Sequence, residues 1–269
     1  MVLHGAEAGE RSYFLYEHLA QLMGEEGVAV LRYDRRPAAA GDDVPLQTQA
    51  QDSLASLRML REVIGPVPAG LWGYSQGAWA AALAATMQPV LVQFLVCVSF
   101  SGVSPAVQMR VGCANQLRKH GFDEHAVTEL TATRRVCEHY LRTGEDGEQA
   151  RQLLNIAVGR PWFPHAYLPP SLPEPGSWPD MDFDPGAILA RLSCPVLAFY
   201  GETDEWMPID ESVSAWRSAQ DRGAPIDLSI VRLPGADHLP TRGGQPSPEA
   251  ISTLYAETLA GWVPSVCGG

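Results

Sequence analysis

The 269 residues are enough to bury a hydrophobic core, and a composition of 46% hydrophobic and 19% charged residues excludes a disordered chain. The formal net charge of -12 disfavours nucleic acid and anionic membranes as partners, because a negative surface repels phosphate groups. The basic pairs Arg35-Arg36 and Arg134-Arg135 are short, and we interpret them as solvent-exposed rather than as binding patches.

The chain has five cysteines without CxxC spacing, so it indicates neither a disulfide framework nor a zinc site. Residues 1–10 lack the basic and apolar stretches of a signal peptide, and no run approaches the roughly 18 apolar residues of a membrane helix. We therefore expect a cytoplasmic protein that holds no metal.

Short apolar runs bounded by Gly, Pro or Asp alternate along the chain with longer helix-like stretches, a pattern typical of a parallel sheet covered by helices on both faces. The predicted strands span residues 1–4, 28–34, 70–74, 94–100, 195–200 and 228–233. The predicted helices of this layer span residues 11–25, 47–64, 76–87, 210–222 and 248–262. The fold class predicted is therefore α/β.

Residues 103–192 break this alternation and are predicted to be a cap inserted into a core domain of residues 1–102 and 193–269. The cap contains two predicted helices, 106–120 and 124–143, followed by a proline-rich run from 160 to 185. Long irregular segments of this kind often form lids. We expect the following aromatic residues to bind substrate: Trp162, Phe163, Trp178 and Phe183 of the cap, with Tyr74 of the core. The alternative for each cap residue is simple packing of the insertion.

The sequence Gly73-Tyr74-Ser75-Gln76-Gly77 is a G-x-S-x-G motif that follows an apolar strand and opens into an alanine-rich helix. A nucleophilic serine on such a sharp turn has a strained backbone, and the flanking glycines let strand and helix approach closely. Ser75 is therefore the predicted nucleophile.

A serine hydroxyl needs a base to act as a nucleophile, preferably a histidine oriented by a carboxylate. His238 follows the last predicted strand, where a loop at the carboxyl edge of the sheet can reach the serine turn. Asp204 follows the preceding strand, in the chain order Ser, Asp, His. Glu202 and Glu205 flank this aspartate and are alternatives to it.

The tetrahedral intermediate needs hydrogen-bond donors for its oxyanion. The backbone N–H of Gln76, directly after the nucleophile, is the first predicted donor. The second is expected from the loop after the first strand, where we favour the N–H of Ala6 over that of Gly5. We interpret His4 as a structural residue that braces this loop.

Together these features resemble the α/β-hydrolase superfamily over essentially the whole chain. The resemblance rests on the His4-Gly5 loop, Tyr33-Asp34-Arg35-Arg36, the Ser75 turn, residues 201–204 and His238. The runs at 73–79 and 98–105 are similar to esterase and acyl-thioesterase-like members that carry a helical cap.

The resemblance implies hydrolysis of a carboxylic ester or thioester through an acyl-enzyme, without a cofactor. The aromatic residues of the cap predict a small-molecule substrate with an apolar acyl or alcohol part. Acyl transfer or cyclisation by the same triad is one alternative. A ligand-binding member of the fold without catalytic activity is another.

Relatives in this superfamily have two strands before the His-Gly loop, and this sequence lacks them. The predicted strand 28–34 therefore becomes a sheet edge, and Val28-Ala29-Val30-Leu31 is apolar and without proline or lysine. Such an edge favours pairing with another chain. We expect a homodimer along this edge, or upstream residues that pair there.

Overall fold

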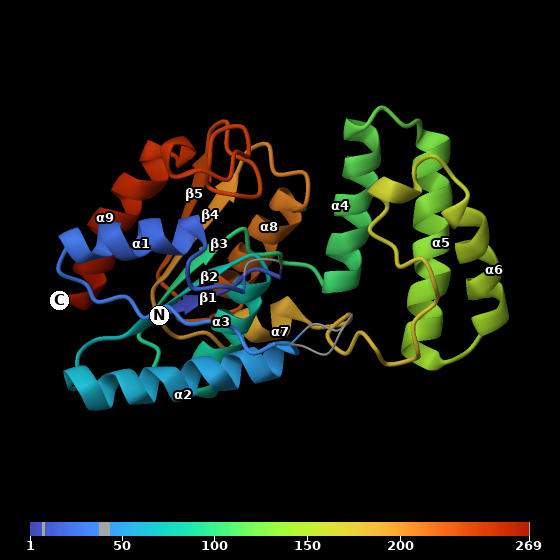
Figure 1. The fold of residues 1–269 in the computed structure, drawn as a ribbon. Coiled ribbons are helices and arrows are strands. Elements are labelled where there is room, and N and C mark those ends of the chain that lie inside the picture. Colours follow the sequence, from blue (N-terminus) through green and yellow to red (C-terminus); the bar gives the residue numbers. More distant parts are fainter. Residues whose placement is uncertain (7–8, 38–43, 269) are drawn as a thin grey trace.

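The computed structural model describes residues 1–6, 9–37 and 44–268. Within this part of the chain, five parallel strands form one sheet in the order β1-β2-β3-β4-β5 (Figure 1). The three inner strands are buried along their whole length, which explains their continuous apolar sequences. The strands are β1 (Val2–Leu3), β2 (Gly70–Tyr74), β3 (Phe94–Val98), β4 (Val196–Gly201) and β5 (Leu228–Leu233).

Helices cover both faces of this sheet, as the α/β pattern predicts (Figure 1). One face carries α2 (Leu46–Ile64), α3 (Gln76–Met87), α7 (Pro185–Leu189) and α8 (Ile209–Asp221). The other face carries α1 (Phe14–Glu25) and α9 (Thr253–Cys267). The α/β-hydrolase fold class expected from the sequence is confirmed.

The inserted segment, predicted at residues 103–192, lies between β3 and β4, and three long helices in it stand beside the sheet (Figure 1). They are α4 (Pro105–Lys119), α5 (Glu124–Thr143) and α6 (Gly147–Val158). Their buried side chains form clusters separate from those on the sheet. The helix α6 is not among the predicted elements, although Ala150, Leu154 and Ala157 are apolar at helical spacing and are buried.

The end of the inserted segment packs with the core. Ile188, Leu189 and Leu192 belong to the hydrophobic cluster on the α2/α3 face of the sheet. The chain therefore returns to the core before residue 192, earlier than the predicted boundary.

The predicted strand at residues 28–34 is wrong, since this described segment has no regular strand structure. It runs beside β1, where the Val2 N–H donates to the Leu31 carbonyl oxygen at 3.1 Å. β1 itself has only two residues, and its ladder is with β2. The flat edge strand on which we based the homodimer is absent from the described segment, and the dimer stays an untested prediction.

The C-terminal helix also begins later than predicted. Its N-cap is Ser252, whose hydroxyl accepts a hydrogen bond from the Tyr255 N–H, and the predicted start at Pro248 is a separate short 3₁₀ turn. Ile251 lies between this turn and the helix, where it forms an isolated antiparallel β-bridge with Thr241.

None of the helices in the described part of the chain is both long enough and apolar enough to cross a membrane.

Candidate active site

Ser75 lies on the turn between β2 and α3, with φ 52° and ψ -119°. A positive φ is costly for a residue with a side chain, and such strain persists where the surrounding structure enforces it. Here the Ser75 N–H donates to the Val98 carbonyl oxygen of β3 at 2.8 Å. The turn is thereby fixed at the carboxyl edge of the sheet.

The glycines of the motif are required by close backbone approach. A Cβ on Gly73 would overlap the carbonyl oxygen of Gly77, at the first turn of α3. A Cβ on Gly77 would overlap the carbonyl oxygen of Leu3 in β1. The sharp strand-to-helix turn therefore depends on both positions lacking a side chain.

His238 and Asp204 complete a hydrogen-bonded chain with the serine. His238 Nε2 lies 2.9 Å from Ser75 Oγ, and His238 Nδ1 lies 2.9 Å from Asp204 Oδ2. The three residues follow β2, β4 and β5, whose carboxyl ends meet at one edge of the parallel sheet. The structure thus brings together three residues separated by up to 163 positions.

The carboxylate of Asp204 is fully buried and is held by its own loop. Its Oδ1 accepts hydrogen bonds from the backbone N–H groups of Trp206 at 2.8 Å and Met207 at 3.2 Å, which leaves Oδ2 for the histidine. The alternative acids do not contact His238 in this way: Glu202 is exposed, and Glu205 accepts from Lys119 at 2.9 Å. Geometry favours Asp204 as the orienting acid.

The loop after β1 reaches the same edge of the sheet. The Gly5 N–H donates to the Tyr16 hydroxyl at 3.2 Å, and the Arg35 guanidinium donates to the carbonyl oxygens of Gly5 and Ala6. Arg35 also donates to Gln76 Oε1 at 3.1 Å, which ties the loop to the start of α3. Ala6 and Gln76, the two residues predicted to bind the oxyanion, both line the cavity at Ser75.

His4 supports this loop from beneath the site. It is buried, its Nε2 lies 2.8 Å from the Tyr33 carbonyl oxygen, and its ring packs against Tyr16 and Tyr33. Burial lowers the pKa of His4 to about 4, so the ring is neutral at physiological pH. These contacts suit a structural residue.

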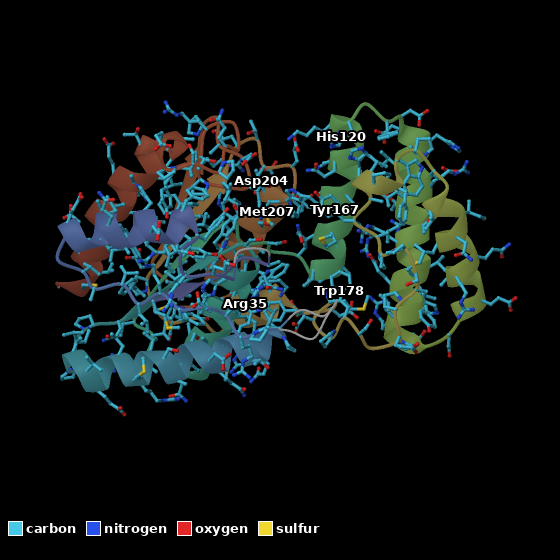
Figure 2. The ribbon with its side chains drawn as sticks, viewed as in Figure 1. Arg35, His120, Tyr167, Trp178, Asp204 and Met207 are labelled. Carbon is cyan, nitrogen blue, oxygen red and sulfur yellow. The ribbon has the colours of Figure 1, made fainter. Side chains whose placement is uncertain are left out.

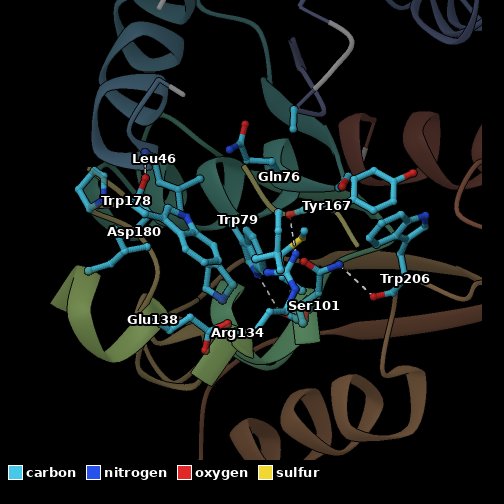
Figure 3. A pocket seen from close by; sticks show the side chains of 18 of the residues that line it. Leu46, Gln76, Trp79, Ser101, Arg134, Glu138, Tyr167, Trp178, Asp180 and Trp206 are labelled. Carbon is cyan, nitrogen blue, oxygen red and sulfur yellow. Dashed lines mark hydrogen bonds between the residues drawn. The ribbon is translucent and has the colours of Figure 1, made fainter. Parts of the chain in front are cut away.

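A cavity of about 790 Å³ extends from the serine to the inserted segment (Figure 3). Ser75 and His238 lie on its core side, and Tyr74 and Trp178, both predicted to bind substrate, also line it. Tyr167 of the inserted segment and Met207 of the core, both labelled in Figure 2, line this cavity as well. The inserted helices and the sheet edge therefore enclose one shared space.

A family model described as the alpha/beta hydrolase family matches residues 1–252. The chain belongs to the alpha/beta hydrolase family. Comparison with curated protein sequences gives no match. Several solved structures of other proteins are similar to the fold of this chain over almost its whole length.

Est1E from Butyrivibrio proteoclasticus, solved with ferulic acid bound, has a TM-score of 0.60 and 16% identity, over 100% of this chain and 88% of that one. Proline iminopeptidase from Mycobacterium smegmatis has a TM-score of 0.57 and 19% identity, over 98% of this chain and 88% of that one. An esterase from Pyrococcus furiosus has a TM-score of 0.55 and 12% identity, over 98% of this chain and 79% of that one. At these identities the likeness concerns the fold.

Three aromatic residues predicted to bind substrate do not line the cavity in the described structure. Trp162 is buried inside the inserted segment, where its Nε1 donates to Glu129 at 3.3 Å. Phe163 packs in the same segment, and Phe183 packs beside Trp79 on the core cluster. For these three, the packing alternative is the one that the structure shows, because each belongs to or packs against a hydrophobic cluster.

Other cavity residues were missed by sequence reasoning. Trp206 lies in the Asp204 loop and contacts Tyr167 edge-to-face, with ring centroids 4.7 Å apart (Figure 3). Its position two residues after Asp204, in a loop at the carboxyl edge of the sheet, is a sequence signal for a site residue. Arg134 and Glu138 also line the cavity, and our interpretation of Arg134 as solvent-exposed is wrong, since it is buried on the inner side of α5.

Proposed function

We propose that the protein is a serine hydrolase that cleaves a carboxylic ester or thioester through an acyl-enzyme. The observation that carries this proposal is the continuous hydrogen-bonded chain from Ser75 Oγ through His238 to Asp204, opening into a cavity. Nucleophile, base and orienting acid all lie within ordinary hydrogen-bond distance, as nucleophilic catalysis requires. Membership of the alpha/beta hydrolase family agrees with this assignment.

In the acylation step, Ser75 Oγ attacks the carbonyl carbon of the substrate while His238 Nε2 accepts the hydroxyl proton. The imidazolium that forms is stabilised by the Asp204 carboxylate, which accepts a hydrogen bond from Nδ1–H. Collapse of the tetrahedral intermediate breaks the bond to the alcohol or thiol, which takes the proton from Nε2. The acyl group stays on the serine.

The negative charge on the former carbonyl oxygen needs donors that are already in position. In this proposal they are the backbone N–H groups of Gln76, at the N-terminus of α3, and Ala6. The hydrogen bonds from Arg35 to the Ala6 carbonyl and the Gln76 side chain support both positions. One such donor typically contributes about 10²- to 10³-fold to kcat.

Deacylation uses the same groups in reverse order. His238 takes a proton from water, the hydroxide oxygen attacks the acyl carbon, and the serine leaves with the proton from Nε2. A volume of about 790 Å³ accommodates a substrate of substantial size, and the apolar residues Met109, Leu141 and Leu168 favour one with an apolar part.

The test is labelling with a fluorophosphonate probe, followed by peptide mass mapping. We expect the label on Ser75, and none on Ser75→Ala protein. We also expect Ser75→Ala to lower turnover of an activated ester by about 10⁴-fold or more, because triad residues act as a unit. A folded wild-type protein that leaves Ser75 unlabelled would support the alternative of a ligand-binding protein without catalytic activity.

Acyl transfer is separated from hydrolysis by product analysis. Turnover of an ester in the presence of an added alcohol yields free acid from a hydrolase and a new ester from a transferase. We expect free acid as the main product. If the new ester is the main product, the protein is an acyltransferase that uses the same triad.

A further inference from the structure

The first helix of the inserted segment docks on the loop that carries Asp204. This helix, α4, lies between the core and α5 (Figure 1). Gln108, Gly112 and Asn115 all meet this loop, and their spacing places them on one side of the helix. A Cβ on Gly112 would overlap the Trp206 ring, so the helix and the loop are in close contact.

Asn115 holds the peptide unit between Glu205 and Trp206. Its Nδ2 donates to the Glu205 carbonyl oxygen at 2.9 Å. In a planar trans peptide the C=O and N–H bonds point in opposite directions, so the Trp206 N–H of this unit points away from α4. That N–H donates to Asp204 Oδ1 at 2.8 Å. One peptide unit is therefore fixed by Asn115 on its outer side and by Asp204 on its inner side.

Gln108 holds the next peptide unit in the same way. Its Nε2 donates to the Trp206 carbonyl oxygen at 2.9 Å, and the Met207 N–H of that unit donates to Asp204 Oδ1 at 3.2 Å. The other carboxylate oxygen, Oδ2, lies 2.9 Å from His238 Nδ1. The orientation of the carboxylate toward the histidine thus depends on two peptide units that the inserted helix holds from outside.

A hydrogen bond to the carbonyl side of a peptide unit affects its N–H side in two ways. It resists rotation of the peptide plane, and it polarises the amide, which strengthens the hydrogen bond that the N–H donates. The Asp204 carboxylate is not exposed to solvent, so bulk water does not replace these donors. Loss of either amide on α4 should therefore loosen the carboxylate.

We propose that Gln108 and Asn115 are positioning residues of the reaction, which act on His238 through the Asp204 loop. Because this role concerns the triad, it rests on the function proposed above. Gln108 also lines the cavity, whereas Asn115 is not part of the cavity wall. The helix α4 therefore belongs to the framework that orients the acid, besides forming one wall of the cavity.

The first test is steady-state turnover of an activated ester by variants that lose one donor at nearly constant size. We expect Asn115→Leu and Gln108→Met each to lower kcat about tenfold, with the KM of Asn115→Leu within about twofold of the wild type. Gln116→Met on the same helix is the control and should keep the wild-type kcat, because Gln116 donates to the Glu205 side chain, at 3.2 Å, and not to a peptide unit. Equal losses in all three variants, or no loss in the first two, would overturn the proposal.

A double-mutant cycle then tests whether the amides act through Asp204. In an Asp204→Ala background the acid that they orient is gone, so Asn115→Leu should change the residual kcat by less than about twofold. A second loss of about tenfold in that background would show that Asn115 acts elsewhere. If Gln108→Met, at a buried position, does not fold, the half-buried Asn115 decides the question by itself.

A measurement without substrate separates this proposal from the catalytic one. The nitrogen-15 shifts of the His238 ring show which ring nitrogen carries the proton, and the contact with Asp204 favours Nδ1. We expect Asn115→Leu to lower the share of this tautomer, and Gln116→Met to keep the wild-type share. A lower share supports the positioning role even if the wild-type protein hydrolyses no ester. An unchanged share in folded Asn115→Leu protein removes that role, and turnover by the wild type then supports the hydrolase alone.

Discussion

The hydroxyl of Ser99 donates a hydrogen bond to the backbone carbonyl oxygen of His238, at 2.9 Å. Ser99 follows β3, is buried, and has a positive φ of 53°, as the nucleophile does. Two strained serines on neighbouring strand ends thus hold the site: one is the candidate nucleophile, and the other holds the loop that carries the candidate base.

We expect Ser99→Ala to lower kcat about tenfold with little change in KM, because the His238 loop loses a buried hydrogen bond and the imidazole loses part of its orientation. Steady-state kinetics on an activated ester gives both constants. Ser56→Ala is the control, since the Ser56 hydroxyl donates within α2 at 2.9 Å, away from the cavity. Equal kcat for the wild type and Ser99→Ala would rule out a positioning role.

Asp204→Asn should reduce kcat by about 10⁴-fold, because an amide can present its NH₂ group to Nδ1 and stabilise the wrong tautomer of His238. Glu202→Gln should leave kcat within about twofold of the wild type, since the Glu202 side chain is exposed. Both are measured by steady-state turnover. A larger loss from Glu202→Gln would identify the other acid as the orienting group.

Two glycine substitutions should change stability in opposite directions. Gly77→Ala places a Cβ against the Leu3 carbonyl oxygen, and we expect a loss of about 3 kcal/mol or more in the free energy of unfolding, or no folded protein. Gly261→Ala lies in α9 with open space around the new Cβ, and we expect a gain of about 0.5 to 1 kcal/mol. Urea unfolding measures both. A tolerated Gly77→Ala would contradict the close approach of α3 and β1.

The stability of the protein should depend on His4 at mildly acidic pH. Its pKa is about 4 in the folded protein and 6.5 when unperturbed, so between these values the unfolded chain binds a proton that the folded protein does not. Stability from this group is therefore complete above pH 6.5 and is lost as pH falls toward 4, by about 3 kcal/mol. We expect His4→Gln to remove this part of the pH dependence in urea unfolding. Equal slopes for both proteins would show that His4 titrates normally.

The local sequence was enough to predict the centre of the site. The G-x-S-x-G motif requires a strand before Ser75 and a helix after it, and the parallel topology places later strand ends beside it. Asp204 and His238 each follow a predicted strand, but the sequence alone leaves Glu202 and Glu205 as alternatives to Asp204. Only the structure places the Asp204 carboxylate against His238. The physical reason is that backbone geometry and chain order bring these three residues together.

Tertiary packing decided the rest. Helical periodicity predicts α5, but it does not say that Arg134 and Glu138 face a cavity, whereas Trp162 fills the inserted segment. An aromatic ring packs equally well in a core or a pocket, and a charged side chain is buried only where neighbouring segments supply its partners. In the same way, residues 28–34 have the composition of a strand, but the structure gives this segment no regular strand, and it meets β1 through the hydrogen bond from the Val2 N–H to the Leu31 carbonyl oxygen. These outcomes depend on distant segments, which local sequence does not encode.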